Sequence, residues 1–298
     1  MIAILGAGAM GRLWAASLPA DETAVIARPG QSPDTPLSYT FLALDGSERT
    51  VTVPWLAPSQ VPELVLVTTK AGDTLTALEA ITDTLPPTVP IVLFQNGLGS
   101  QQQVAERWPE RPVLAASTTE GANRPSPGRV VHAGAGATWL GPMTESANAI
   151  ILAECAATLA SSGLTVHPES DILGRLWQKL VINAGINPFT ALLDCPNGDI
   201  LHAELFQNHI DGLCQEIANL MEAEGQPKQA PSALRERIET IARNTARNTS
   251  SMRSDIQNGR ATEIDYINGF LVRLGQSKGI ATPVNQMLAE RVQQLSPN

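Results

Sequence analysis

The sequence predicts an α/β protein, with an N-terminal Rossmann-like, doubly wound sheet followed by an all-helical C-terminal domain. In the first half of the chain, short apolar runs alternate with segments of helical periodicity, a pattern typical of parallel sheets covered by helices. Beyond Pro168 the strand pattern ends, and helical periodicity continues towards the C-terminus. We therefore expect two domains, residues 1–168 and residues 169–298.

The composition indicates an acidic globular chain. It has 298 residues, of which 43% are hydrophobic, and a net charge of −9 with a pI near 5.0. This balance argues against nucleic acid or an anionic membrane as a partner, because both select basic surfaces. No apolar run is long enough for a membrane span. Three widely separated cysteines favour neither a disulfide framework nor a metal site, so we expect a cytoplasmic protein without a bound metal.

The first predicted element leads into a glycine-rich turn. The apolar run at residues 2–5 predicts a strand, and residues from Leu13 onward have helical spacing. Between them lies G-x-G-x-x-G, whose glycines permit a tight turn, close approach to a pyrophosphate and close packing of helix on strand. The helix N-terminus offers free amides to the phosphates. A tight turn without a ligand is the alternative. The cofactor-binding residues expected here are Gly6, Ala7, Gly8, Ala9, Met10 and Gly11.

Arg28 indicates which dinucleotide this loop binds. It follows the second strand, expected at residues 24–27, where NAD-binding chains commonly carry an acidic residue for the ribose 2′-hydroxyl. A guanidinium suits a 2′-phosphate instead, so the expected cofactor is NADP, used as NADPH. The alternative is an ordinary surface arginine.

The next elements continue the alternation of strand and helix. Residues 37–53 predict a hairpin that turns at Asp45-Gly46. Lys70 and Asn96 follow two later strands, at the carboxyl ends where such sheets bind ligands. We expect the strand at 129–140 to close the sheet in antiparallel fashion. The other expected elements of this domain are strands at 64–67, 91–94, 113–119 and 164–167, and helices at 73–85, 100–108 and 145–161.

The second domain is expected to place a polar stripe on a buried helix. Lys179, Asn183 and Asn187 recur every fourth residue in an otherwise apolar segment, so they share one side of a helix. Pro188 should end or kink that helix. The stripe is either a surface face, a set of side chains paired within the protein, or a ligand site with a cationic proton donor. The expected helices are 172–185, 199–223, 231–246, 263–274 and 283–295.

A second polar segment occupies residues 250–269. Thr262 and Glu263 could cap a helix, and the residues after them could form an ordinary amphipathic face. Functional clefts often lie at domain interfaces. We therefore expect a cleft between the two domains, in which the nicotinamide ring of the cofactor would face Lys179.

Together these residues resemble the ketopantoate reductase family, the NADPH-dependent enzymes of pantothenate synthesis. The resemblance covers nearly the whole chain and implies reduction of 2-dehydropantoate to (R)-pantoate. The stretches that carry it are GAGAMG at 6–11, VTTKA at 67–71, QNGLG at 95–99, LWQKL at 176–180, INPFTA at 186–191, CPNG at 195–198, SSMRSD at 250–255 and TEIDYING at 262–269.

The resemblance also implies roles for single residues. Lys179 looks like the lysine that protonates the substrate oxygen, and Glu263 like the acidic residue that contacts cofactor or substrate. Asn96 would bridge cofactor and substrate. The remaining implied residues are Lys70 and Ala122 beside the cofactor, and Asn183, Asn187, Asn197 and Ser251 beside the substrate.

Two alternatives to this activity were considered, and the assembly state stays open. A related NADP-dependent reductase could act on another 2-keto or hydroxy acid. A non-catalytic NADP-binding sensor is disfavoured, because it would be expected to lose the lysine and the asparagines, which this chain keeps. The small-molecule substrate is the expected partner, and the chain could be a monomer or a homodimer.

Overall fold

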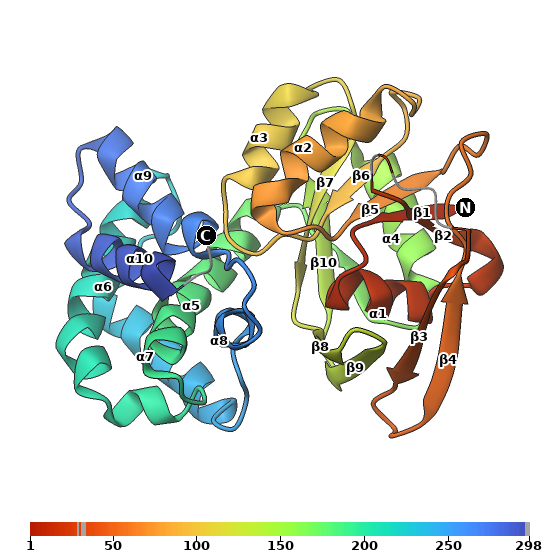
Figure 1. The fold of residues 1–298 in the computed structure, drawn as a ribbon. Coiled ribbons are helices and arrows are strands. Elements are labelled where there is room, and N and C mark those ends of the chain that lie inside the picture. Colours follow the sequence, from red (N-terminus) through yellow and green to blue (C-terminus); the bar gives the residue numbers. More distant parts are fainter. Residues whose placement is uncertain (29, 31–33, 296–298) are drawn as a thin grey trace. The chain divides into compact units, whose positions relative to one another are not determined.

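The computed structural model describes residues 1–28, 30 and 34–295, and their contacts divide the chain into two compact units (Figure 1). The first unit comprises Met1–Gln95 and Ser100–Ile172. The second comprises Asn96–Gly99 and the chain from Leu173 onward. The four residues Asn96–Gly99 therefore belong with the C-terminal helices, although they lie between two elements of the first unit in the sequence.

A seven-stranded sheet forms the centre of the first unit. Its strands lie in the order β11 (Val166–Pro168), β10 (Thr138–Pro142), β7 (Val113–Thr118), β6 (Ile91–Leu93), β5 (Leu64–Val67), β1 (Ile2–Leu5) and β2 (Thr23–Ile26). The five strands from β7 to β2 are parallel, and β10 pairs antiparallel with β7. Strand β11 pairs parallel with β10 at the edge. Adjacent parallel strands present their carboxyl ends at one edge of the sheet, which decides where its ligand-facing loops lie.

Helices cover both faces of this sheet, as the alternation of side chains in β1 requires. Ile2 and Ile4 pack in one core cluster with residues of α1 (Ala9–Ser17) and α4 (Ala149–Ala160). Ala3 and Leu5 point the other way and pack with residues of α2 (Ala71–Thr82) and α3 (Ser100–Arg107). Strands β1 and β5 are buried along their whole length, as expected for strands covered on both faces. The predicted α/β fold is confirmed.

A second, four-stranded sheet has the order β4 (Glu48–Val53), β3 (Leu37–Leu42), β9 (Arg129–Gly134) and β8 (Gly121–Ser126). The predicted hairpin is confirmed, with Gly46 in the left-handed region at φ +83°. The prediction of one strand over 129–140 is wrong, because β9 joins the second sheet and β10 the first. The expected antiparallel pairing with the first sheet is confirmed for β10 alone. The chain crosses between the two sheets at Gly136, where a Cβ atom would collide with the backbone of Thr119.

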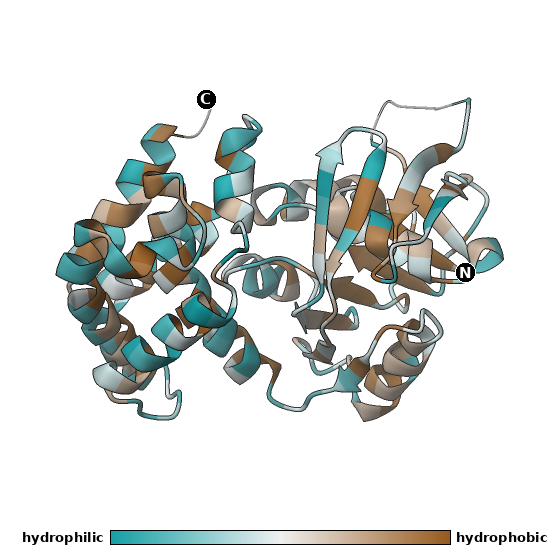
Figure 2. Cartoon of the chain, turned by 90° about the horizontal axis from the view of Figure 1, so that it is seen from below, coloured by the Kyte–Doolittle hydropathy of each residue, from teal (hydrophilic) through white to brown (hydrophobic). Residues whose placement is uncertain are grey.

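The second unit is helical, as predicted. Its helices are α5 (Ile172–Leu193), α6 (Glu204–Ala223), α7 (Pro231–Asn244), α8 (Ser251–Gln257), α9 (Asn268–Lys278) and α10 (Pro283–Leu295), with short 3-10 turns at Asp199–His202 and Ile264–Tyr266. In the first unit a third such turn spans Ala20–Glu22. Figure 2 shows hydrophilic and hydrophobic residues interspersed along these helices, as in amphipathic packing. Within the described ranges, the structure contains no helix with the length and apolar character needed to cross a membrane.

The expected break at Pro188 is wrong, since α5 continues to Leu193 with this proline inside it. A proline in a helix deprives the carbonyl four residues earlier, here that of Ala184, of its usual donor. The buried side chain of Asn268 replaces this donor, with its Nδ2 atom 3.4 Å from the Ala184 oxygen. The same Nδ2 atom lies 3.0 Å from Oδ1 of Asn285 at the start of α10. A distant side chain therefore supports the backbone that the proline leaves incomplete.

Candidate active site

The glycine-rich loop between β1 and α1 has the form of a phosphate cradle. Gly6 has φ +105°, and a Cβ atom there would approach the amide nitrogen of Thr69 to 2.7 Å. A Cβ atom on Gly11 would collide with the Gly6 carbonyl. At Gly8, in contrast, the nearest atom would be the Thr68 oxygen at 3.9 Å. Packing explains the first and last glycines, whereas the middle one leaves open space that a close ligand could use.

The N-terminus of α1 adds favourable electrostatics to this cradle. Gly8 occupies the cap position, no side chain caps the helix, and its first turn carries no acidic residue. Free amides and the positive end of the helix dipole therefore lie at the loop. These groups suit the pyrophosphate of a dinucleotide, so the loop 6–11 fits the expected cofactor.

The other cofactor-side residues lie on the first unit. Arg28 is exposed just beyond β2, next to residues outside the described ranges. Lys70 is half-buried just beyond β5 and occupies the cap position of α2. Strands β5, β1 and β2 are adjacent and parallel, so the structure brings Lys70, the glycine-rich loop and Arg28 to one edge of the sheet. Ala122 lies on β8 of the other sheet and packs against the core cluster that Ala7 and Met10 also contact.

The polar stripe of α5 runs from half-buried to buried. Lys179 and Asn183 are half-buried, and Asn187 is buried. Burial lowers the pKa of Lys179 from 10.5 to about 8, and the negative charge of Glu263 opposes this shift. An ammonium group with this pKa is a more effective acid near neutral pH than an ordinary lysine.

Glu263 joins Lys179 to the segment Asn96–Gly99. The Nδ2 atom of Asn96 donates to Oε2 of Glu263 at 2.9 Å. The segment is held in place by the amide of Leu98, which donates to the Tyr266 oxygen at 2.8 Å. Gly97 has φ +80°, and a Cβ atom there would collide with the same carbonyl. The second unit thus contains a cation, a carboxylate and a carboxamide that interact with one another.

The remaining substrate-side candidates lie around the start of α8. Asn197 is buried, and its Nδ2 donates to Oγ1 of Thr245 at 3.0 Å. Its Oδ1 atom is buried without a hydrogen-bond partner in the described part of the chain, so it could accept a bond from a ligand. Ser251 is exposed as the first residue of α8. The hydroxyl groups of Thr190 and Ser250, 2.7 Å apart, join α5 to this region.

Reasoning from sequence missed several supporting residues. Asp194, with φ +47°, accepts bonds from Nε of Arg253 at 2.8 Å and Nε2 of Gln257 at 2.7 Å, which ties the end of α5 to α8. The buried amide of Gln95 donates to the carbonyls of Val67 and Thr69, at 3.0 and 3.2 Å, and so links the ends of β6 and β5. Arg253 and Gln95 stand inside recognisable motifs, but nothing in a linear pattern identifies their partners.

Comparisons with known proteins identify the family of this chain. Residues 2–145 match the family Ketopantoate reductase PanE/ApbA, and residues 171–296 match Ketopantoate reductase PanE/ApbA C terminal. The 2-dehydropantoate 2-reductase of Shigella flexneri is 35% identical over 300 residues, which cover 98% of this chain and 93% of that protein.

Two solved structures extend the likeness to the fold. A PanE/ApbA family ketopantoate reductase from Ralstonia eutropha JMP134 has a TM-score of 0.84 at 29% identity, covering 99% of this chain and 97% of that one. The ternary structure of D-mandelate dehydrogenase with NADH and anilino(oxo)acetate also has a TM-score of 0.84, at 25% identity and the same coverage. With both family matches and a full-length relative in agreement, the chain belongs to the ketopantoate reductase family of oxidoreductases.

Proposed function

We propose that this chain reduces 2-dehydropantoate to (R)-pantoate with NADPH, the step that supplies pantoate for pantothenate and coenzyme A synthesis. The observation that carries this proposal is Lys179 on α5, whose pKa desolvation lowers to about 8 and whose charge interacts with that of Glu263. The 35% identity to a 2-dehydropantoate 2-reductase along nearly the whole chain supports the choice of substrate.

The residues of α5 would perform the acid part of the reaction. Bound NADPH would supply the hydride for the keto carbon. Negative charge then gathers on the carbonyl oxygen, where the Lys179 ammonium would stabilise it and donate a proton. Glu263 would keep the ammonium oriented, and its bond from Asn96 fixes the carboxylate in turn. Asn183, Asn187, Asn197 and Ser251 would bind the polar groups of the 2-keto acid.

The first unit would bind the dinucleotide. The loop 6–11 and the uncapped start of α1 suit the pyrophosphate, and Lys70 and the Ala122 backbone would lie along the cofactor. The exposed guanidinium of Arg28 would select the 2′-phosphate of NADPH. We propose a monomer or homodimer in the cytoplasm.

A second candidate is a dehydrogenase of another 2-hydroxy acid. The likeness to D-mandelate dehydrogenase, which was solved with NADH, favours it. The two candidates differ in substrate and in cofactor, so one set of rates separates them.

The deciding experiment follows nicotinamide absorbance with purified protein. Turnover of ketopantoate with NADPH at a much higher kcat/KM than oxidation of D-mandelate with NADP⁺ or NAD⁺ supports the first candidate, and the reverse order supports the second. Binding of NADPH without turnover of any 2-keto acid would point to a sensor instead.

Lys179→Ala tests the role of the proton donor in the same assay. Loss of a general acid typically costs about 10²–10⁴-fold in rate. Lys228→Ala is the matched control, because Lys228 is an exposed lysine of the same unit that pairs with Glu222. Undiminished kcat in Lys179→Ala would exclude the proposed role.

A further inference from the structure

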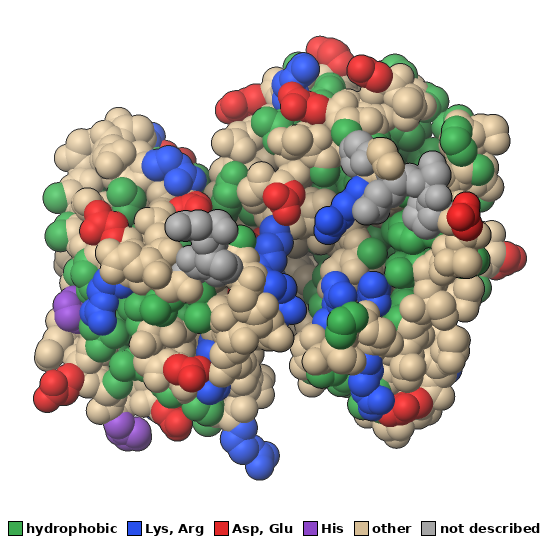
Figure 3. All heavy atoms as spheres, viewed as in Figure 1, with side chains coloured by type: hydrophobic (Ala, Val, Ile, Leu, Met, Phe, Trp, Pro, Cys, Tyr) green, Lys and Arg blue, Asp and Glu red, His purple; other side chains and the backbone are tan. Residues whose placement is uncertain are grey.

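Glu120 and His132 form a buried pair where the chain passes from one sheet of the first unit to the other. The Oε2 atom of Glu120 lies 2.7 Å from Nε2 of His132, and the two side chains are 3% and 8% exposed. An ionised carboxylate can only accept hydrogen bonds, so Nε2 carries the proton between them. Among the described residues, each side chain is the other's only hydrogen-bond partner. Figure 3 agrees with this burial, because the described histidines visible on that face lie over the second unit only.

The pair stands at the short connection from β7 to β8, which consists of Thr119 and Glu120. The Thr119 amide donates to the Ala137 oxygen at 2.9 Å, and the Ala137 amide donates to Oγ1 of Thr119 at 3.0 Å. The Glu120 amide donates to Oγ1 of Thr118 at 3.1 Å. The connection is therefore fixed along its backbone up to the residue that precedes β8.

The first residues of β8, in contrast, lack a regular ladder. The register between β8 and β9 shifts just before Ala122 pairs with His132, so Ala133 has no partner on β8. Such a bulge leaves one residue unpaired and bends the strand locally. Directly opposite residues of an antiparallel pair point to the same face, so the side chains of Ala122 and His132 share one. The contact between Glu120 and His132 thus spans the bulge and holds the backbone on which Ala122 lies.

The position of this bulge indicates which part of a dinucleotide it meets. In the sheet, β5, β6 and β7 follow one another on one side of β1, and β2 lies on the other side. A dinucleotide binds across the carboxyl ends of such strands, with one half on each side of the point where the strand order reverses. Arg28, beyond β2, is proposed to bind the 2′-phosphate of the adenosine half. The connection after β7 therefore belongs to the nicotinamide half.

We propose that the Glu120–His132 pair positions the backbone at Ala122 for the nicotinamide half of the cofactor. The inference rests on the proposed function, which supplies both the cofactor and the place of Ala122 beside it. Glu120 and His132 act through the backbone of β8 and not by touching the cofactor, so both are positioning residues.

The test separates affinity from stability with His132→Leu, Glu120→Leu and the variant that combines them. Either single change leaves a buried polar group without its partner, whereas the double change replaces both groups by apolar ones. Thermal unfolding without cofactor should therefore show a lower melting temperature in each single variant and recovery in the double variant. The Kd of NADPH should not recover, and should be raised about ten-fold in all three. His132→Gln, whose amide can donate to Glu120, should stay within about three-fold of the wild type.

Three probes locate the effect on the cofactor. NADPH and NADH both carry the nicotinamide half, and nicotinamide fluorescence follows the binding of each. In contrast, 2′,5′-ADP carries only the adenosine half with its 2′-phosphate, and calorimetry measures its Kd. The three leucine variants should weaken NADPH and NADH by similar factors. The Kd of 2′,5′-ADP should stay within about two-fold of the wild type, because Arg28 and the glycine-rich loop are unchanged.

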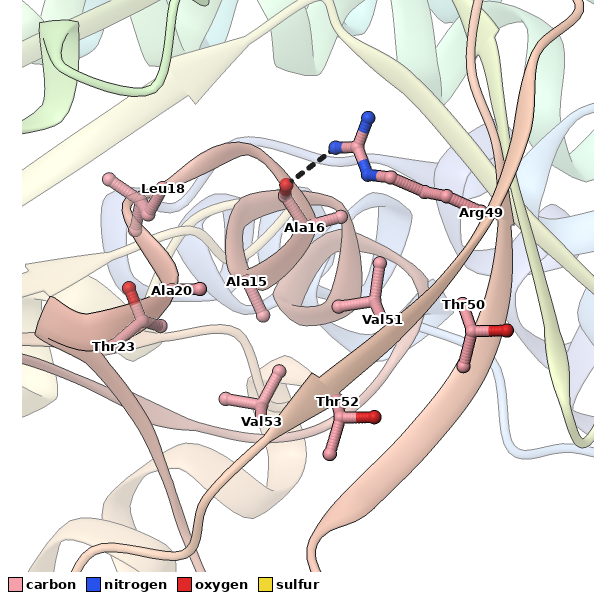
Figure 4. A pocket seen from close by; sticks show the side chains of 10 residues that line it. All are labelled: Ala15, Ala16, Leu18, Ala20, Thr23, Arg49, Thr50, Val51, Thr52 and Val53. Atoms are coloured by element: carbon pink, nitrogen blue, oxygen red, sulfur yellow. Dashed lines mark hydrogen bonds between the residues drawn. The ribbon is translucent and has the colours of Figure 1, made fainter.

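Two variants control for general damage to the first unit. Arg111 is a buried arginine just before β7, and its guanidinium donates to three backbone carbonyls of residues 85–89 at 2.8–3.2 Å. Arg49 lies on β4, at the other edge of the second sheet from β8. Its Nη2 atom donates to the Ala16 oxygen at 2.7 Å beside a cavity of about 300 Å³ (Figure 4). Arg111→Gln should lower the melting temperature, and both Arg111→Gln and Arg49→Gln should keep the Kd of NADPH within about two-fold of the wild type.

Four results contradict the inference. Unchanged Kd values in all three leucine variants would exclude a part for the pair in cofactor binding. Recovery of NADPH affinity together with stability in the double variant would make the pair a purely structural contact. Equal weakening of 2′,5′-ADP would show an effect beyond the nicotinamide half, and an equal loss in Arg111→Gln would trace it to a general loosening of the unit. A wild type that binds neither NADPH nor NADH would instead refute the proposed function, on which this inference depends.

Discussion

The pH dependence of ketopantoate reduction should report the protonation of Lys179. Burial lowers its pKa to about 8, while attraction to Glu263 acts in the opposite direction. Because a proton donor must carry its proton, kcat/KM should be level near pH 6–7, halve at about pH 8 and fall about ten-fold per pH unit above that. At about pH 9, roughly a tenth of the activity should remain, whereas a lysine with the ordinary pKa of 10.5 would retain nearly all of it.

The assay is the rate of NADPH consumption at low ketopantoate concentration, between about pH 6 and pH 10 at constant ionic strength. These conditions give kcat/KM, which reports the free enzyme rather than the substrate complex. Glu263→Gln supplies a directional test, because removal of the negative charge should move the inflection below its wild-type pH. A wild-type profile that stays level to about pH 10, or an inflection that rises in Glu263→Gln, would refute the reasoning.

Three further predictions concern stability and cofactor choice. Lys179→Met should be more stable than the wild type at pH 7, because the pKa of Lys179 is lower in the folded than in the unfolded state and its charge therefore destabilises the folded protein most below about pH 8. In chemical denaturation, the difference in free energy of unfolding should shrink by about 2 kcal/mol between pH 7 and pH 9.5. A difference that stays constant over this range would contradict the lowered pKa. Arg28→Ala should raise the KM for NADPH and leave that for NADH unchanged, and an equal rise for both would exclude a contact with the 2′-phosphate. Asn268→Leu removes the donor to the Ala184 carbonyl and should lower the free energy of unfolding by about 1–3 kcal/mol, whereas Asn219→Leu on the exposed face of α6 should change it by less than about 0.5 kcal/mol.

Local patterns predicted the strands that are buried on both faces, because a short apolar run bounded by turn residues is typical of such strands. They missed β8, whose residues include Asn123, Arg124 and Pro125 and have little strand propensity. Its pairing partner β9 supplies the hydrogen bonds that make it a strand. Local sequence also could not show that residues 129–140 form two strands, because the passage of the chain from one sheet to the other at Gly136 depends on the tertiary fold.

The candidate site, like the fold, could be predicted from local patterns only in part. Periodicity alone put Lys179, Asn183 and Asn187 on one side of a helix, and the structure retains that helix. It could not reveal that the helix continues past Pro188, because the replacement donor Asn268 comes from another helix. Nor could it reveal that Asn96 donates to Glu263, since the two residues are far apart in sequence and no periodicity relates them.

The segment Asn96–Gly99 limits how this chain can be divided. A fragment that starts at Leu173 would contain α6–α10 and all of α5 except its first residue, but not these four residues. It would leave the Tyr266 carbonyl without the amide of Leu98 and Glu263 without the carboxamide of Asn96. A chimera that takes its C-terminal half from a relative would therefore also need residues 96–99 from that relative. The helical unit is therefore discontinuous in sequence, because four of its residues are encoded within the other half of the chain.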